Sequence, residues 1–259
     1  TTGTNNTAVG YVALCANTTG HYNTAIGHMA GCSNTTGNSN TAFGKSSLKK
    51  TTTGEYNTAI GTRSLYTNTI GTCNTAVGYR ALFSNTTQHG NTAVGTKSLE
   101  ANTTGSENTA SGVYSLADNT TGSSNVAMGR GSLGNNTTGC SNTALGTYAL
   151  TNTTTATANT AVGRQALWCN TTGVNNTASG YGALLSSTTA SQNTAVGVYA
   201  ARFTSTGHSN VALGYSALYC NTTGPSNVAI GMSALERNTT ADSNIAIGAA
   251  SQLATTTGG

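Results

Sequence analysis

Apolar and polar residues along the chain follow a pattern that returns every 17 residues. Each unit begins with Asn-Thr-Ala-Val-Gly or a close variant and continues with Ala-Leu and then Asn-Thr-Thr-Gly, as in residues 6–22. The units begin at Asn6, Asn23, Asn40, Asn57, Asn74, Asn91, Asn108, Asn125, Asn142, Asn159, Asn176, Asn193, Asn210, Asn227 and Asn244. The spacing never changes, so the chain is an uninterrupted tandem repeat of 15 units.

Within the unit, some positions hold one residue type and others vary freely. Counting the opening Asn as position 1, position 3 is always Ala, position 5 is always Gly, and position 9 is Leu in most units. Position 2 is Thr, Val or Ile, and position 4 is mostly a larger apolar residue. Positions 6, 7, 10, 11, 16 and 17 vary and hold nearly all charged residues, aromatic residues and cysteines. The invariant positions are therefore those at which the fold makes its contacts.

The pattern predicts β-structure. A β-branched segment that ends in Gly is typical of a short strand followed by a turn. We expect the Ala-Leu-x-x-Asn-Thr-Thr-Gly stretch to form a second strand or strand-like side. One unit cannot bury its own Val and Leu, but stacked units can, in continuous ladders. We therefore predict an all-β fold: a β-solenoid of 15 coils with a 17-residue repeat, a single array over residues 1–259 about 70 Å long at ~4.8 Å per coil.

The direction of the side chains follows from the alternation within a strand. We expect positions 2 and 4 to point inward with the Leu of position 9, which leaves the Ala of position 3 pointing outward. An outward position that accepts only Ala suggests a close neighbour, and we predict that identical rods, three in number, pack along it. This chain-packing face comprises Ala8, Ala25, Ala42, Ala59, Ala76 and Ala93 in the first six units.

Three segments carry a resemblance to a known family. Residues 124–129, 209–214 and 226–231 (Ser-Asn-Val-Ala followed by Met, Leu or Ile and then Gly) resemble the Ser-Val-Ala-Ile-Gly repeats of trimeric autotransporter adhesin (YadA-like) heads. The resemblance implies a left-handed β-roll assembled as a parallel homotrimer. The fuller unit is similar to arrays in phage tail fibres, where the array often precedes an intramolecular chaperone domain. The adhesin-head units are shorter and lack the Thr-Thr-Gly extension.

Composition narrows the function classes. Only 6% of the residues are charged, the formal net charge is +4, and the longest basic run is the pair Lys49-Lys50. No basic stripe interleaved with aromatic residues is evident along the sequence, so a nucleic-acid partner is not expected. No apolar stretch approaches the ~20 residues of a membrane span. The sequence opens and closes inside a repeat, so we expect it to be a segment of a longer chain.

Nothing in the pattern predicts catalysis, a metal site or a cofactor. The six acidic residues are scattered over several units, and the histidines that share position 16, namely His21, His89 and His208, lie several coils apart. Catalysis needs different groups gathered at one place, and calcium-binding turns are rich in Asp, whereas these turns offer Thr and Gly. We therefore expect a non-enzymatic protein.

Two modifications are suggested by the spacing. Cys15 and Cys32 occupy position 10 of consecutive units, so their Cα atoms would lie about 5 Å apart, within range of a disulfide. Asn-x-Thr sequons recur at position 12, or one position earlier for Asn152, and are either glycosylation acceptors or an Asn ladder inside the turns. These residues are Asn17, Asn34, Asn85, Asn102, Asn119, Asn136, Asn152, Asn170, Asn221 and Asn238.

The function that we expect is mechanical. The solenoid would be the shaft or head of a virion tail fibre or cell-surface adhesin, extracellular, and presented to a cell-surface glycan or receptor. One alternative is a surface filament built by end-to-end stacking of solenoids. A second alternative is ice binding through the Thr ranks of positions 13 and 14, although residues such as Lys50, Phe203 and Arg237 at position 11 lie beside them.

Overall fold

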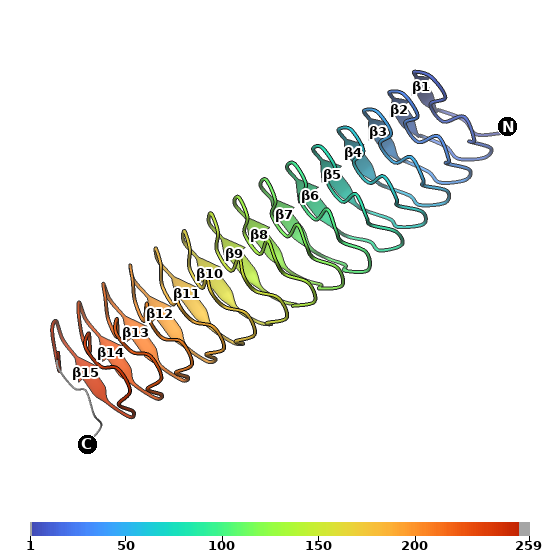
Figure 1. Cartoon of the computed structure of the whole chain (residues 1–259). Coiled ribbons are helices and arrows are strands. Elements are labelled where there is room, and N and C mark those ends of the chain that lie inside the picture. The colour runs from blue at the N-terminus through green and yellow to red at the C-terminus, as the bar shows by residue number, and fades with distance from the viewer. Residues whose placement is uncertain (1, 254–259) are drawn as a thin grey trace. The chain divides into compact units, whose positions relative to one another are not determined.

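The computed structural model describes residues 2–253, and within them every regular element is a three-residue strand (Figure 1). The first seven strands are β1 (Thr7–Val9), β2 (Thr24–Ile26), β3 (Thr41–Phe43), β4 (Thr58–Ile60), β5 (Thr75–Val77), β6 (Thr92–Val94) and β7 (Thr109–Ser111). The other eight are β8 (Val126–Met128), β9 (Thr143–Leu145), β10 (Thr160–Val162), β11 (Thr177–Ser179), β12 (Thr194–Val196), β13 (Val211–Leu213), β14 (Val228–Ile230) and β15 (Ile245–Ile247). Each strand covers positions 2 to 4 of one repeat, and we number the coils by their strands.

The contacts divide the chain into two compact units, residues 1–125 and 126–259, where the sequence predicts one array. Both units are built from the same coil. Neighbouring strands within each unit are parallel and pair without any shift, so that Thr24, Ala25 and Ile26 lie opposite Thr41, Ala42 and Phe43. The predicted β-solenoid with a 17-residue repeat is confirmed.

Hydrogen bonds between coils continue around the whole turn. Between coils 2 and 3, for example, Gly44 N–H donates to Ile26 O at 2.8 Å, Gly31 N–H to Ser47 O at 3.0 Å, and Thr35 N–H to Thr52 O at 2.9 Å. The Asn-Thr-Thr-Gly side is thus bonded to its neighbours, but its residues lie in bends and irregular backbone. Of the two forms expected there, a second regular strand is absent from the described coils, because Thr35 and Thr36 both donate to the same Thr52 carbonyl instead of forming a regular ladder.

The interior corrects the predicted direction of the strand side chains. The Leu of position 9 is buried as expected, but the Ala of position 3 is buried beside it, and positions 2 and 4 point outward. A Cβ placed at Gly31, which stands in the Leu position of coil 2, would lie 3.8 Å from the Ala25 Cβ, so positions 3 and 9 face each other across the coil. With the Leu of position 9 filling the interior, the methyl group of Ala already makes van der Waals contact across the coil.

The Ala face predicted for chain packing is therefore a core column. Of its members, Ala25, Ala42, Ala59, Ala76 and Ala93 are buried inside the coils, and Ala8, in the first coil, is exposed. Position 3 is always Ala because larger side chains do not fit within so thin a coil, not because another chain approaches it. Side chains that could meet a second copy are those of positions 2 and 4.

Backbone conformation of an unusual kind shapes each turn. Residues at positions 7, 9 and 17 have positive φ in nearly every coil, and the Leu residues of position 9 lie between 46° and 54°. A non-glycine residue in this region costs about 1–2 kcal/mol. At position 9 the burial of the Leu side chain, about 1.5–3 kcal/mol, offsets that cost.

The Gly of position 5 is required by close approach between coils. Gly27 has a φ of +136°, and a Cβ added to it would lie 2.7 Å from the carbonyl carbon of Gly44 in the next coil. The same contact recurs at position 5 along each unit. Side chains are thus excluded wherever this corner of one coil rests on the corner of the next.

Candidate functional surfaces

The outer face of the strands is uncharged in every coil. We call this surface the strand face; it consists of the side chains of positions 2 and 4, which are all Thr, Ser, Val, Ile, Leu, Met or Phe. Several of its apolar members are well exposed, including Phe43 at 52% and Met128 at 47%. A surface position that only met water would be expected to admit charges, as positions 6, 7, 10 and 11 do. The strand face is therefore the first candidate for contact with another molecule.

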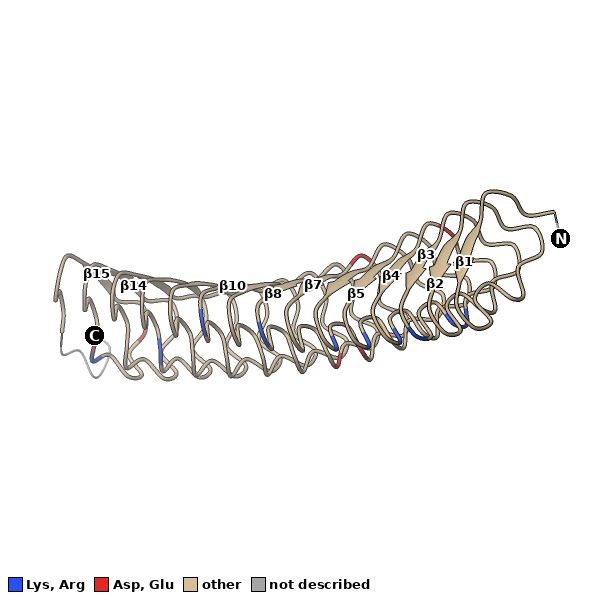
Figure 2. Ribbon diagram, turned by 90° about the horizontal axis from the view of Figure 1, so that it is seen from above, with Lys and Arg blue, Asp and Glu red and all other residues tan. Residues whose placement is uncertain are grey.

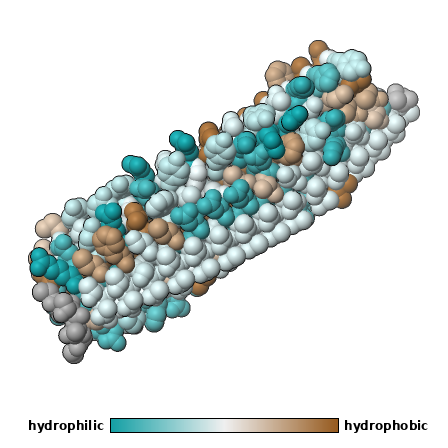
Figure 3. Space-filling model, viewed as in Figure 1, coloured by the Kyte–Doolittle hydropathy of each residue, from teal (hydrophilic) through white to brown (hydrophobic). Residues whose placement is uncertain are grey.

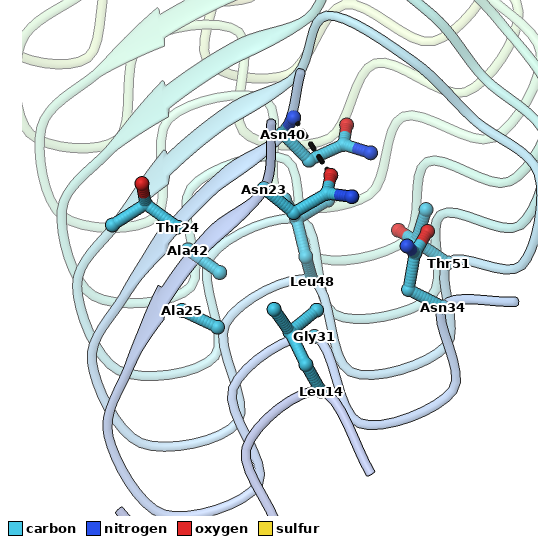
Figure 4. A pocket seen from close by; sticks show the side chains of 10 residues that line it. All are labelled: Leu14, Asn23, Thr24, Ala25, Gly31, Asn34, Asn40, Ala42, Leu48 and Thr51. Atoms are coloured by element: carbon cyan, nitrogen blue, oxygen red, sulfur yellow. Dashed lines mark hydrogen bonds between the residues drawn. The ribbon is translucent and has the colours of Figure 1, made fainter. Parts of the chain in front are cut away.

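Two columns of buried Asn side chains run through the coils, one at position 1, directly before the strand, and one at position 12. At position 1, Asn40 N–H donates to Asn23 Oδ1 at 3.0 Å (Figure 4), and Asn23 Nδ2 donates to Gly37 O at 2.8 Å. At position 12, Asn34 Nδ2 donates to Gly37 O at 2.9 Å and to Asn17 Oδ1 at 3.0 Å. One carbonyl at position 15 thus receives an amide from each column, which joins the two ladders.

The burial of position 12 favours the ladder over glycosylation. The amide of each sequon in this column, apart from half-buried Asn17, is buried, and a glycan on it would break the hydrogen bonds to the turn. The buried members are Asn34, Asn85, Asn102, Asn119, Asn136, Asn170, Asn221 and Asn238. Asn152, at position 11, is half-buried and its Oδ1 accepts a hydrogen bond from Asn135 Nδ2 at 3.1 Å.

The Thr ranks of positions 13 and 14 differ in what they offer to solvent. The position 13 hydroxyl donates to a backbone carbonyl of the next coil, as Thr35 Oγ1 does to Thr52 O at 3.0 Å. Position 14 is exposed throughout and holds Thr in every described coil except coil 4, where Ile70 stands. Figure 3 shows rows of residues of intermediate hydropathy, in white, on the face that it views. One rank of exposed side chains, nearly all Thr, therefore runs through the described coils.

The variable positions gather cations and aromatic rings that the sequence separates. Lys49 Nζ and Lys50 Nζ lie 5.5 Å and 5.7 Å from the Tyr66 ring centroid, and Arg80 Cζ lies 4.3 Å from the Phe83 ring. In the compact unit of residues 126–259, Arg202 Cζ lies 4.4 Å from the Tyr199 ring centroid. The sequence analysis missed this interleaving because the partners are up to 17 residues apart. The repeat position of each Lys, Arg and aromatic residue could have revealed these contacts, because it shows which residues stack in neighbouring coils.

None of the cysteines, all of which lie within residues 2–253, is joined in a disulfide. The predicted disulfide between Cys15 and Cys32 is not formed; Cys15 Sγ donates instead to the Cys32 carbonyl at 3.3 Å. Stacked residues point the same way, so the two side chains run parallel, a direction that does not suit the geometry of a bridge. Burial raises the pKa of the Cys169 thiol, and burial, followed by the charge of Glu236, raises the pKa of Cys220.

A small cavity lies inside coils 1 to 3, lined among others by Leu14, Gly31 and Leu48 (Figure 4). Gly31 occupies the position where the neighbouring coils have Leu, so the cavity is the space of a missing isobutyl group. Its wall is almost wholly apolar, and it offers no group for chemistry. In residues 2–253, no three His, Cys, Asp or Glu side chains are grouped so that they could hold a metal ion.

No family model matches the chain, and no similar curated protein or solved structure was found. Over residues 2–253 no helix is long and apolar enough to cross a membrane. Function is therefore inferred from the fold and its surfaces.

Proposed function

We propose that the chain is a non-catalytic structural segment of a surface fibre, the shaft or head of a virion tail fibre or a cell-surface adhesin. Its copies pack in parallel through their strand faces. The single observation that supports this is the lack of any charged residue at the 30 outward strand positions, although many of these side chains are exposed. Parallel packing about a symmetry axis sets each rank against the same rank of the neighbouring copy.

The number of copies that we propose is three, as the resemblance to adhesin heads implies. In a trimer each strand face can turn towards a common axis, which removes exposed apolar side chains such as Val9 and Ile247 from water. The hydrogen bonds around every coil would then give a shaft that resists bending and proteolysis. Such a shaft would hold a binding tip away from an extracellular surface, where the partner is a cell-surface glycan or receptor.

The experiment is a mass measurement in solution combined with paired substitutions. We expect light scattering to give three times the 25.8 kDa chain mass, and the double variant Val77→Lys/Val94→Lys to dissociate because it places charges in a buried contact. The matched control is Thr87→Lys/Thr104→Lys, which adds the same charges to the exposed position 14 of the same two coils. A monomeric parent chain, or equal behaviour of the two variants, would contradict the proposal.

A second candidate is ice binding, favoured by the exposed Thr rank of position 14. Regular hydroxyls one coil apart could order water, and the control variant Thr87→Lys/Thr104→Lys would interrupt them. If this function is correct, the parent chain shows thermal hysteresis and this variant loses most of it, while Val77→Lys/Val94→Lys keeps it. Absence of hysteresis in the parent chain would remove the candidate.

A further inference from the structure

The positive charge of the chain is concentrated in coils 3 to 6. The chain has 10 Lys and Arg and 6 Asp and Glu. Residues 45–100 contain six of the cations and only two of the carboxylates, so the rest of the chain is balanced. Figure 2 shows Lys and Arg along one edge of these coils. We call this surface the basic edge; it consists of Lys45, Lys49, Lys50, Arg63, Arg80 and Lys97.

The fold stacks these cations in neighbouring coils. Arg63, Arg80 and Lys97 occupy position 7 of coils 4, 5 and 6, one above another at about the 4.8 Å separation of paired strands. Like charges at this separation repel each other, so the row is not explained by the stability of the coil. An anion that lay along the row would relieve the repulsion.

Carboxylates compensate only part of the basic edge. Glu100 lies 2.6 Å from Arg80 Nε and 3.5 Å from Lys97 Nζ. Two further carboxylates belong to these coils. Glu55 at position 16 accepts a hydrogen bond from Asn38 Nδ2, and Glu107 at position 17 accepts one from Ser124 Oγ at 3.3 Å. Lys45, Lys50 and Arg63 are exposed, and no carboxylate of residues 2–253 forms an ion pair with them.

Aromatic rings hold the cations in place and leave little ring surface for a ligand. Tyr66 and Phe83 stack on each other with centroids 5.1 Å apart and planes 11° apart. Lys49 and Lys50 lie over Tyr66, and Arg80 lies over Phe83. Single-stranded nucleic acids are bound through bases stacked on free aromatic faces, and these rings are half-buried and already occupied. The basic edge is therefore arranged to recognise charge rather than bases.

We propose that the basic edge binds a linear acidic polysaccharide whose sulfate or carboxylate groups follow the row of cations from coil to coil. A rigid row reduces the ordering cost of binding, because the cation–aromatic contacts and the Glu100 ion pairs already restrain four of the side chains, those of Lys49, Lys50, Arg80 and Lys97. The site lies at positions 6 to 11, on a different part of the coil from the strand face. Its occupation therefore does not depend on the oligomer proposed above.

The test uses the full chain and two double variants with identical charge changes. Lys45→Glu/Lys50→Glu alters positions 6 and 11 within the basic edge, and Arg130→Glu/Arg237→Glu alters the same two positions outside it; all four residues are exposed. Binding of fluorescent dextran sulfate is measured against neutral dextran and a single-stranded DNA oligonucleotide of similar length. Circular dichroism checks that both variants keep the fold.

We expect the parent chain to bind dextran sulfate in a salt-dependent manner and neutral dextran not at all. The variant in the basic edge should bind about tenfold more weakly or worse, and the control should change by less than about threefold, because Arg130 and Arg237 are not part of the basic edge. Equal losses in the two variants, or no binding by the parent chain at physiological salt, would overturn the proposal. Tighter binding of the DNA, lost in the same variant, would also overturn it in favour of a nucleic acid.

Discussion

The two Asn columns occupy the same coils and are equally buried, yet only one of them is uninterrupted. Position 1 is Asn in all units, whereas position 12 is Thr or Ser in five of them: Thr51, Thr153, Ser187, Thr204 and Thr255. At position 1, Asn57 Oδ1 accepts the backbone N–H of Asn74 at 3.0 Å as well as its side-chain amide at 3.2 Å. At position 12, Asn68 Oδ1 accepts the side-chain amide of Asn85 at 2.9 Å.

The difference shows which hydrogen bonds a coil can lose. The Oδ1 of a position 1 Asn accepts a buried backbone N–H of the next coil, so replacement of that Asn leaves the N–H without its acceptor. Where side chains satisfy each other, both can be lost at a smaller cost. The cost is still visible: Asn34 Oδ1 and Asn170 Oδ1, each followed in the next coil by a Thr or Ser, are buried and have no hydrogen-bond partner.

The largest effect is expected in coil 4, where Asn can be replaced by Thr in each of the two columns separately and the two single variants compared. Asn57→Thr should destabilise the fold by about 3 kcal/mol, since it leaves the Asn74 N–H unpaired and removes the bond to the Gly71 carbonyl. Asn68→Thr should cost about 1 kcal/mol, because Thr already stands at position 12 in coil 3. Urea denaturation measures both, and similar losses would contradict our reading of the two columns.

The next effect extends the comparison to the apolar column at position 9. Gly31→Leu should stabilise the fold by about 1–2 kcal/mol, because it fills the cavity between Leu14 and Leu48. The φ of Gly31 is 54°, close to the 47° of Leu48, so the backbone already suits Leu. Leu14 Cδ2, 3.1 Å from the new Cβ, must shift slightly. A rise in the denaturation midpoint is expected, and a fall would show that the neighbouring coils cannot accept the side chain.

A repair of the interrupted column should have a smaller effect. Ser187→Asn would place an amide where it can donate to Asn170 Oδ1 and to the Ala190 carbonyl, as the other Asn residues of this column do. Each new bond contributes about 0.5–1.5 kcal/mol, and the larger buried side chain offsets part of it. We expect a net stabilisation of about 1 kcal/mol by denaturation, with Ser186→Asn, at the neighbouring half-buried position, as the control without gain.

The smallest effect is expected outside both columns. Ile70→Thr at position 14 restores the Thr rank at a site that is 53% exposed. Substitutions at such surface sites change stability by less than about 0.5 kcal/mol. Hydrogen exchange in coil 4 should be unaltered, and a larger change would show that position 14 belongs to the ladder.

The repeat length, the stacking of coils and the inward Leu could be predicted from sequence, because an unchanging spacing of 17 residues permits only in-register stacking. The strand face could not. Alternation shows that Thr24 and Ile26 share one side and Ala25 the other, but it does not show which side is inward. We expected the larger apolar residues inside; the coil is too thin for them. The basic edge was missed because its contacts, such as Arg80 on Glu100, join residues of different repeats.

The shared hydrogen-bonding pattern of the coils has a consequence for the length of the chain. The backbone N–H and Nδ2 of Asn57 donate to Asn40 Oδ1 in coil 3, just as those of Asn74 donate to Asn57 Oδ1 in coil 4, since each side chain meets an identical partner. If residues 57–73 were deleted, Asn74 would meet Asn40 in the geometry that Asn57 now has. Recombination between repeats can therefore shorten or lengthen such a protein by whole coils, because the hydrogen bonds at the new junction are the same as those between any two neighbouring coils.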